Sequence, residues 1–96
     1  MVEIHTRAII KEEVVIMYKV LLNSVEKVKD FVNITSKFEF DAFLKSGRYV
    51  IDAKSIMGVF SINLMYPIDL FIEFKDTYDE AQVAEYLKLI EQFICE

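Results

Sequence analysis

The chain has 96 residues, enough for one small domain with a hydrophobic core and too few for two. Hydrophobic residues make up 54% of it, and there are only two glycines and one proline. This composition excludes disordered chains, flexible linkers and glycine-rich phosphate-binding loops. The formal net charge is −5, so nothing in the composition indicates nucleic acid or an anionic membrane as a partner.

Three features of the sequence indicate a cytoplasmic protein. The longest apolar runs have about five residues, far below the roughly 20 that a transmembrane helix needs. The N-terminal residues lack the basic start and the apolar stretch of a signal peptide. The single cysteine, Cys95, cannot form an internal disulfide, in keeping with a reducing compartment. We therefore expect no association with a membrane.

The first 13 residues form a polar lead-in. We interpret residues 1–13 as an N-terminal extension and residues 14–96 as the folded domain. The run over residues 14–22 is apolar and rich in β-branched side chains, which is typical of a buried strand.

A capping box is expected to begin the first helix, which is predicted over residues 24–36. Asn23 and Glu26 stand three residues apart, the spacing at which two side chains satisfy the first free N–H groups of a helix. The apolar positions recur at helical spacing on one face: Val25, Val28, Phe31, Val32 and Thr35.

A β-hairpin is expected after this helix. Apolar and polar residues alternate over residues 38–45, which predicts the second strand. The apolar face of this strand consists of Phe38, Phe40, Ala42 and Leu44. Ser46-Gly47 is a turn signal, after which residues 48–52 return as a third strand.

Two helices and one strand complete the predicted order. Ser55 suits an N-cap, which predicts a short helix over residues 55–63. A fourth strand is expected over residues 67–74, and a second capping box opens a final helix over residues 77–94. The core face of the strand is expected at Ile68, Leu70, Ile72 and Phe74. That of the helix is expected at Ala81, Ala84, Leu87, Ile90 and Ile94.

The resulting order, β-α-β-β-α-β-α, predicts an α+β domain with helices on one face of an antiparallel sheet. The pattern does not select a strand order. A ferredoxin-like split β-α-β arrangement is therefore one of the alternatives that it leaves open.

Two short segments resemble the HPr family, the small phosphocarrier of the bacterial sugar phosphotransferase system. Ser36-Lys37-Phe38 closes the first predicted helix, and Lys54-Ser55-Ile56-Met57-Gly58-Val59 opens the second, as S-K-F and K-S-I-M-G-V do in that family. The resemblance implies an open-faced β-sandwich: a four-stranded antiparallel sheet in the order 1-4-2-3, with three helices on one face.

The active site of the family is not retained. Its first helix opens with G-I-H-A-R-P-A. Counting back from Ser36-Lys37-Phe38 places Ser24 at the phosphohistidine, Glu26 at the arginine and Lys27 at the proline, and Ser24 itself is interpreted as a helix cap. A phosphoserine is a stable ester, and Glu26 adds negative charge where a cation should compensate the phosphate. The resemblance therefore implies no catalytic residue here. The only histidine, His5, is interpreted as a solvated residue of the lead-in, although that segment is long enough to reach the site.

Ser55 is the family position that this chain keeps. In Gram-positive members a dedicated kinase phosphorylates the equivalent serine, and the product assists a transcription factor. Lys54 beside it is expected to favour a phosphate there. The alternative is that Ser55 is only an N-cap. Ile56, Met57 and Phe60 are likewise open to two interpretations, partner binding or core packing.

We expect no metal, cofactor or catalytic centre. The acidic pairs, Glu12/Glu13 and Asp79/Glu80, are interpreted as solvated charges, and Cys95 as a buried or helix-end thiol. The sequence thus predicts an HPr-like regulatory or adaptor protein that binds phosphotransferase-type or transcription-regulator proteins through its first and second helices. Two alternatives remain: a phosphocarrier that uses an unconventional residue, and a degenerate HPr paralogue that binds an unrelated protein.

Overall fold

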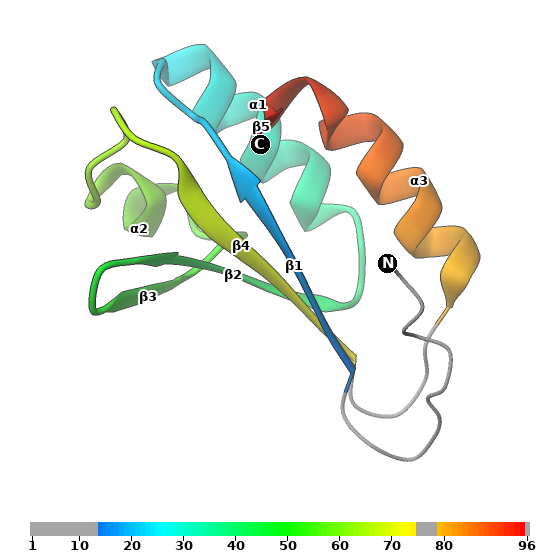
Figure 1. Cartoon of the computed structure of the whole chain (residues 1–96). Coiled ribbons are helices and arrows are strands. Elements are labelled where there is room, and N and C mark those ends of the chain that lie inside the picture. Colours follow the sequence, from blue (N-terminus) through cyan, green and yellow to red (C-terminus); the bar gives the residue numbers. More distant parts are fainter. Residues whose placement is uncertain (1–13, 75–78, 96) are drawn as a thin grey trace.

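The computed structural model describes residues 14–74 and 79–95, so the predicted extension, residues 1–13, lies outside it. The described elements follow the predicted order β-α-β-β-α-β-α and then add a short turn and a strand (Figure 1). In chain order they are β1 (Val14–Val20), α1 (Val25–Ser36), β2 (Asp41–Ser46), β3 (Tyr49–Asp52), α2 (Ile56–Phe60), β4 (Ile68–Phe74), α3 (Glu80–Ile90), the 3₁₀ turn η2 (Glu91–Phe93) and β5 (Ile94–Cys95).

The strand order of the sheet is β3-β2-β4-β1-β5. β4 pairs antiparallel with β1 on one side and with β2 on the other. The first and fourth strands are therefore neighbours, and the second lies beside the fourth, as the resemblance implied. β3 pairs with β2 at the edge and does not lie beside β1, which excludes the ferredoxin-like alternative.

The expectation of four strands is wrong, because the described sheet has five. The final helix was predicted to continue to residue 94, but α3 ends at Ile90. Phe93 is then buried and packs edge-to-face on Phe31, with ring centroids 5.8 Å apart. The carbonyl of Phe93 accepts a hydrogen bond from the Leu21 N–H at 2.8 Å. These contacts turn the chain back to the sheet, where Ile94 pairs with Val20.

The core face of α3 also differs from the prediction. Val83, Tyr86 and Ile90 are buried, whereas Ala81 and Ala84 are exposed. Of the predicted residues, Ile90 is fully buried, and Leu87 and Ile94 are partly buried and pack against the core. The prediction is therefore wrong at Ala81 and Ala84. On α1 the predicted face is buried except for its first residue, Val25, which is exposed.

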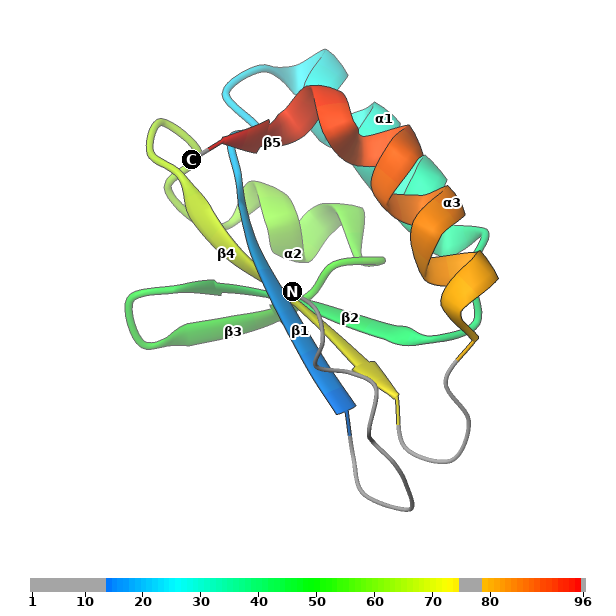
Figure 2. The ribbon, with the colours of Figure 1, turned by 45° about the vertical axis from the view of Figure 1, so that its right-hand side comes forward.

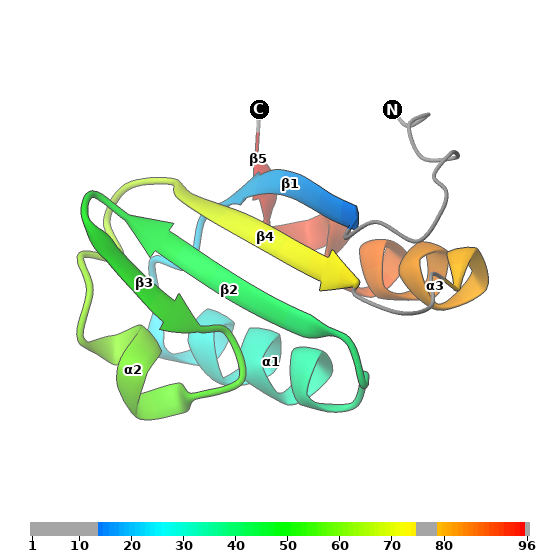
Figure 3. The ribbon, with the colours of Figure 1, turned by 90° about the horizontal axis from the view of Figure 1, so that it is seen from below.

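The helices cover one face of the sheet (Figure 3). α1 contacts α2 and α3, and α3 lies alongside it (Figure 2). β4 shows the division between the two faces most clearly, because its residues alternate between fully and partly buried along its whole length. Ile68, Leu70, Ile72 and Phe74 point into the core, as predicted. Phe40, Ala42 and Leu44 do the same at the second predicted strand, although β2 itself begins only at Asp41.

A buried pair of hydroxyl groups joins α1 to α3. The Thr35 hydroxyl donates to the Phe31 carbonyl at 2.8 Å and lies 2.8 Å from the Tyr86 hydroxyl, which can therefore donate to it. Neither side chain is exposed, and the Tyr86 ring contacts the edges or faces of Phe38 and Phe40. Burial raises the pKa of Tyr86, and the hydrogen bond with Thr35 offsets part of that rise. The Tyr86 hydroxyl is therefore neutral and donates the hydrogen bond to the Thr35 oxygen.

This geometry predicts unequal effects for the two isosteric substitutions. Tyr86→Phe removes one hydrogen bond but leaves Thr35 bonded to Phe31, so it should cost about 0.5–1.5 kcal/mol of unfolding free energy. Thr35→Val leaves the buried Tyr86 hydroxyl without its acceptor and should cost more, about 1–3 kcal/mol. Urea unfolding measures both. The assignment of Tyr86 as donor and Thr35 as acceptor is wrong if Thr35→Val lowers the unfolding free energy no more than Tyr86→Phe does. It is also wrong if the two losses of unfolding free energy simply add in the double variant.

Candidate functional site

The N-terminus of α1 is the first part of the candidate site. Ser24 has an extended backbone, with φ −152° and ψ 157°, and its Oγ accepts a hydrogen bond from the Lys27 N–H at 3.1 Å. The cap is therefore Ser24 and not Asn23. Asn23 instead accepts a bond on Oδ1 from the Lys27 ammonium at 3.0 Å. The Ser24 hydroxyl is exposed, and its oxygen already accepts the hydrogen bond that caps α1.

The electrostatics of this turn do not favour a phosphate. Glu26 lies in the first turn of α1 and is exposed, so its carboxylate occupies the end of the helix that attracts anions. The one cation of this turn, Lys27, is held by the Asn23 side chain. His5, the only histidine in the sequence, lies outside the described residues.

The N-terminus of α2 is the second part. Ser55 is extended, with φ −102° and ψ 106°, and its Oγ accepts a hydrogen bond from the Gly58 N–H at 3.2 Å. The predicted N-cap is thus confirmed. Ser55 is also exposed, so its hydroxyl is accessible at the same time as it caps the helix.

Lys54 makes two hydrogen bonds within the fold. Its ammonium donates to the Phe38 carbonyl at 2.7 Å, and its backbone N–H donates to Asp52 Oδ1 at 2.9 Å. The side chain is partly buried and ties the start of α2 to the segment between α1 and β2. The adjacent position in the sequence suggested a cation for a phosphate on Ser55. In the unmodified protein this cation satisfies a carbonyl.

One face of α2 is apolar and exposed. Val59 is fully buried, whereas Met57 is 77% exposed and Ile56 and Phe60 are 37% and 39% exposed. We call Ile56, Met57 and Phe60 the α2 surface. A core role does not fit Met57, because most of its side chain lies in solvent.

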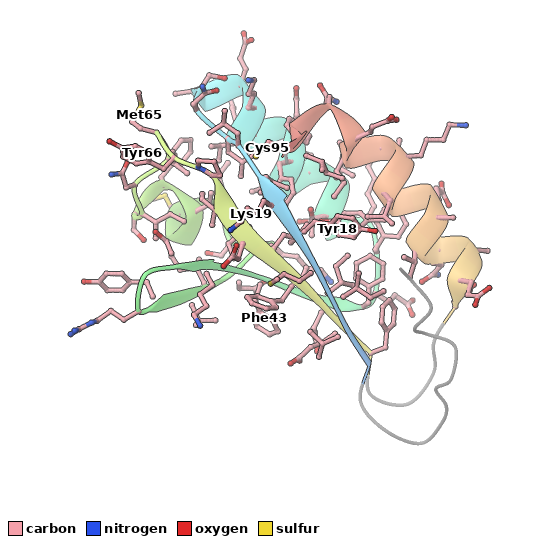
Figure 4. The ribbon with its side chains drawn as sticks, in the orientation of Figure 1. Tyr18, Lys19, Phe43, Met65, Tyr66 and Cys95 are labelled. Atoms are coloured by element: carbon pink, nitrogen blue, oxygen red, sulfur yellow. The ribbon has the colours of Figure 1, made fainter. Side chains whose placement is uncertain are left out.

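Two exposed apolar residues follow in the segment between α2 and β4. Met65 and Tyr66 are 69% and 68% exposed and are labelled in Figure 4. The sequence analysis assigned no function to Met65 or Tyr66. One feature of the sequence could have indicated their exposure: they are two large apolar side chains beside Pro67, in a segment without strand or helix periodicity.

Gly58 is the residue that allows α2 to pack closely on β3. A Cβ atom at Gly58 would lie 2.7 Å from Cγ2 of Ile51 and 3.2 Å from Oγ of Ser55. Contacts this short require a neighbour to move. The glycine therefore fixes the position of both the Ser55 cap and the α2 surface.

The two helix N-termini belong to helices that contact each other, α1 and α2. Within residues 14–74 and 79–95, no hydrogen bond joins Ser24 or Glu26 to Ser55. The candidate site is therefore two separate caps and an apolar surface. It does not form a constellation of reacting groups.

Asp79 and Cys95, which the sequence analysis also considered, belong to a helix cap and a strand. Asp79 is the N-cap of α3, and its Oδ1 accepts from the N–H groups of Ala81 and Gln82. Cys95 is half-buried in the edge strand β5 and so is not part of a helix. The acidic pair Glu12/Glu13 lies outside the described residues.

Among the residues that the structure describes, no group of three or more histidine, cysteine, aspartate or glutamate side chains is placed to hold a metal ion. No described helix is both long enough and apolar enough to cross a bilayer.

The comparisons with known proteins support the fold. No protein-family model matches the chain, and no curated protein matches it. The chain is similar to the crystal structure of HPr-C-His from Thermoanaerobacter tengcongensis, with 26% sequence identity and a TM-score of 0.57. The similarity covers 84% of this chain and 92% of that one. The fold is therefore HPr-like, with an additional edge strand.

The close approach at Gly58 predicts a context-dependent effect of one substitution. Gly58→Ala should destabilise the fold, because overpacking costs about 1–3 kcal/mol and alanine recovers at most about 1 kcal/mol of helix propensity. In an Ile51→Ala background the clashing methyl group is absent, so adding Gly58→Ala should then be neutral or stabilising. Urea unfolding of the four variants of this cycle measures the difference. An equal cost in both backgrounds would show that Ile51 does not set the packing.

Proposed function

We propose that this protein is an HPr-like regulatory or adaptor protein of the phosphotransferase type that does not relay phosphate through a histidine. It acts by binding other proteins, phosphotransferase components or transcription regulators, through α1 and α2. It has no catalytic centre of its own and works in the cytoplasm. The observation that carries the proposal is the pairing of an HPr-like fold with an α1 N-terminus built from Ser24, Glu26 and Lys27.

The chemistry of the α1 N-terminus supports the loss of the relay. A phosphoryl group on a histidine nitrogen is readily passed on, whereas a phosphate ester on Ser24 is stable. The Ser24 Oγ is already an acceptor for the Lys27 N–H, and residues 24–28 include no arginine or histidine. Glu26 would in addition repel the dianion that a relay must hold.

The α2 surface supports a role in protein binding. A run of exposed apolar side chains on one short helix is costly to leave in water and is typical of docking sites. Met57 is flexible and polarizable, which suits a surface that accepts more than one partner. Ser55 begins the same helix, so a modification there lies next to the docking residues.

Ser55 is the candidate regulatory phosphorylation site. A phosphate adds about −1.5 to −2 units of charge at neutral pH. Lys54 is bound to the Phe38 carbonyl, so the new charge would remain facing solvent and partners. The expected consequence is a change of partner with little change in the fold.

The absence of a relay can be tested by phosphate transfer. Incubated with enzyme I of the phosphotransferase system and phosphoenolpyruvate, the wild-type protein should take up no acid-labile phosphate. Ser24→His with Glu26→Arg should gain partial labelling, because it restores a nitrogen nucleophile and a cation on the α1 cap. The gain is limited by Lys27, which stands where the family has proline.

The matched control is Ser24→Ala with Glu26→Arg, which has the same new cation but no histidine. Loss of the Ser24 cap costs about 1 kcal/mol, so circular dichroism must show that all variants are folded. Acid-labile phosphate on the wild-type protein, mapped to His5, would contradict the proposal and favour a carrier with an unconventional residue.

The regulatory role of Ser55 can be tested separately. Treatment with a serine-specific HPr kinase and ATP should add one phosphate, mapped to Ser55 by mass spectrometry and absent from Ser55→Ala. Ser55→Asp keeps a good N-cap and should leave the thermal midpoint within a few degrees of wild type. It should change binding to a transcription regulator that recognises serine-phosphorylated HPr.

Asn63→Asp offers a control, because Asn63 is exposed and its Oδ1, which accepts from the Met65 N–H at 3.0 Å, is kept in aspartate. It adds a negative charge after α2, away from Ser55, and should not reproduce the binding change. Failure of several such kinases to modify Ser55 would leave it a structural cap. Unchanged binding by Ser55→Asp would likewise contradict a switch.

A further inference from the structure

Ser55 stands at the end of a turn that three hydrogen bonds tie to the sheet. The Asp52 carbonyl accepts from the Ser55 N–H at 3.0 Å, and Asp52 Oδ1 accepts from the Lys54 N–H at 2.9 Å. Such a combination of a backbone turn and a side-chain turn is a common role of aspartate. Between them, the Ala53 N–H donates to the Ala42 carbonyl at 2.9 Å. The backbone that leads from β3 into α2 is therefore fixed.

The side chain of Lys54 holds the same turn to a second part of the fold. Lys54 is partly buried, and its Nζ donates to the Phe38 carbonyl at 2.7 Å. A hydrogen bond from a charged donor is roughly twice as strong as one between neutral groups. Lys54 directly precedes Ser55, so this bond restricts the position of the Ser55 backbone.

The acceptor of this bond lies in a segment that is itself held in place. The Phe38 N–H donates to the Thr35 carbonyl of α1 at 3.2 Å. The Phe38 ring stacks on Phe40, with ring centroids 5.2 Å apart, and meets Tyr86 edge-on at 5.1 Å. Lys54 therefore ties the residue before Ser55 to the end of α1 and to the aromatic part of the core.

The position of a hydroxyl matters when it accepts a phosphoryl group. Reacting atoms must lie within about 3–3.5 Å of each other and be aligned, and a misplacement of about 1 Å can lower the rate about a hundredfold. The Ser55 hydroxyl is exposed, and its Oγ is held toward the helix by the Gly58 N–H at 3.2 Å. A residue that fixes the turn before Ser55 thus acts on the place of the reacting oxygen.

We propose that Lys54 is a positioning residue for the phosphorylation of Ser55. In that step the Ser55 Oγ forms a bond to the γ-phosphorus of ATP, the bond from this phosphorus to the oxygen of the leaving ADP breaks, and the hydroxyl proton passes to a base of the kinase. Lys54 takes no part in these bond changes, because its ammonium is bound to the Phe38 carbonyl. The inference rests on the proposed modification of Ser55 and names the residue that prepares it.

Steady-state kinetics with a serine-specific HPr kinase and ATP test this role. Lys54→Met keeps the apolar stem of the side chain and removes its donor. Its kcat for the modification of Ser55 should fall about tenfold or more. KM should change less than about threefold, because the exposed side chains of the α2 surface are retained. Lys54→Arg should recover most of kcat, because a guanidinium also donates to a carbonyl.

Lys37→Met is the matched control. Lys37 is the exposed C-cap of α1 and the residue before Phe38, so this variant removes the same charge nearby and leaves the bond of Lys54 in place. Its kcat should equal that of the wild type. Amide hydrogen exchange adds a measurement without the kinase: the Ser55 N–H should exchange faster in Lys54→Met than in Lys37→Met, while the amides of β4 exchange alike in both.

The outcomes separate this inference from the proposed function. A wild-type protein that takes up no phosphate on Ser55 contradicts the regulatory switch and this role of Lys54 together. If the wild type is modified and Lys54→Met is modified with the same kcat, only the positioning role is overturned. An equal loss in Lys37→Met would show that charge near Phe38 matters and not the bond, which also overturns it. So would a Lys54→Arg variant that is as slow as Lys54→Met.

Discussion

The whole structure depends on the position of β4 between β1 and β2. It is the one described strand with long antiparallel partners on both sides, and it comes late in the chain. β4 therefore holds β1 and β2 together in one sheet. The strict alternation of β4 then separates two environments, a core that receives the helices and an open face that does not. The α2 surface lies on the helix side of the sheet (Figure 3).

Much of the fold was predictable because its strands follow simple periodicity. The core faces of β2 and β4 were identified correctly, since an antiparallel sheet with one buried face requires alternation. The strand order was not accessible from periodicity, and only the resemblance to HPr supplied it. β5 was missed because Ile94 continues a helical spacing with Ile90, and the tertiary contact between Phe93 and Phe31 decides the outcome. The same competition misplaced the core face of α3, where the larger Val83 and Tyr86 displace the alanines.

The candidate site was predictable at the level of caps and exposed side chains. Ser55 as an N-cap followed from its residue type and position and is confirmed. The contact made by Lys54 was not predictable, because its acceptor is the Phe38 carbonyl, 16 positions earlier in the chain. Nothing local distinguishes a lysine that binds a distant carbonyl from one that is available to a phosphate. For the same reason the alignment of Met17, Phe71 and Phe43 across the sheet was not predicted, since only the strand order brings them together.

We propose an HPr-like protein whose α1 cap does not pass on a phosphoryl group and whose α2 surface binds other proteins. The most direct measurement is a reconstituted relay in which this chain replaces HPr, with enzyme I, phosphoenolpyruvate and a sugar-specific acceptor of the system. The account predicts phosphorylation of the acceptor no faster than in a reaction without any HPr, at concentrations where genuine HPr supports rapid transfer. Transfer that depends on this chain and increases with its concentration would contradict it.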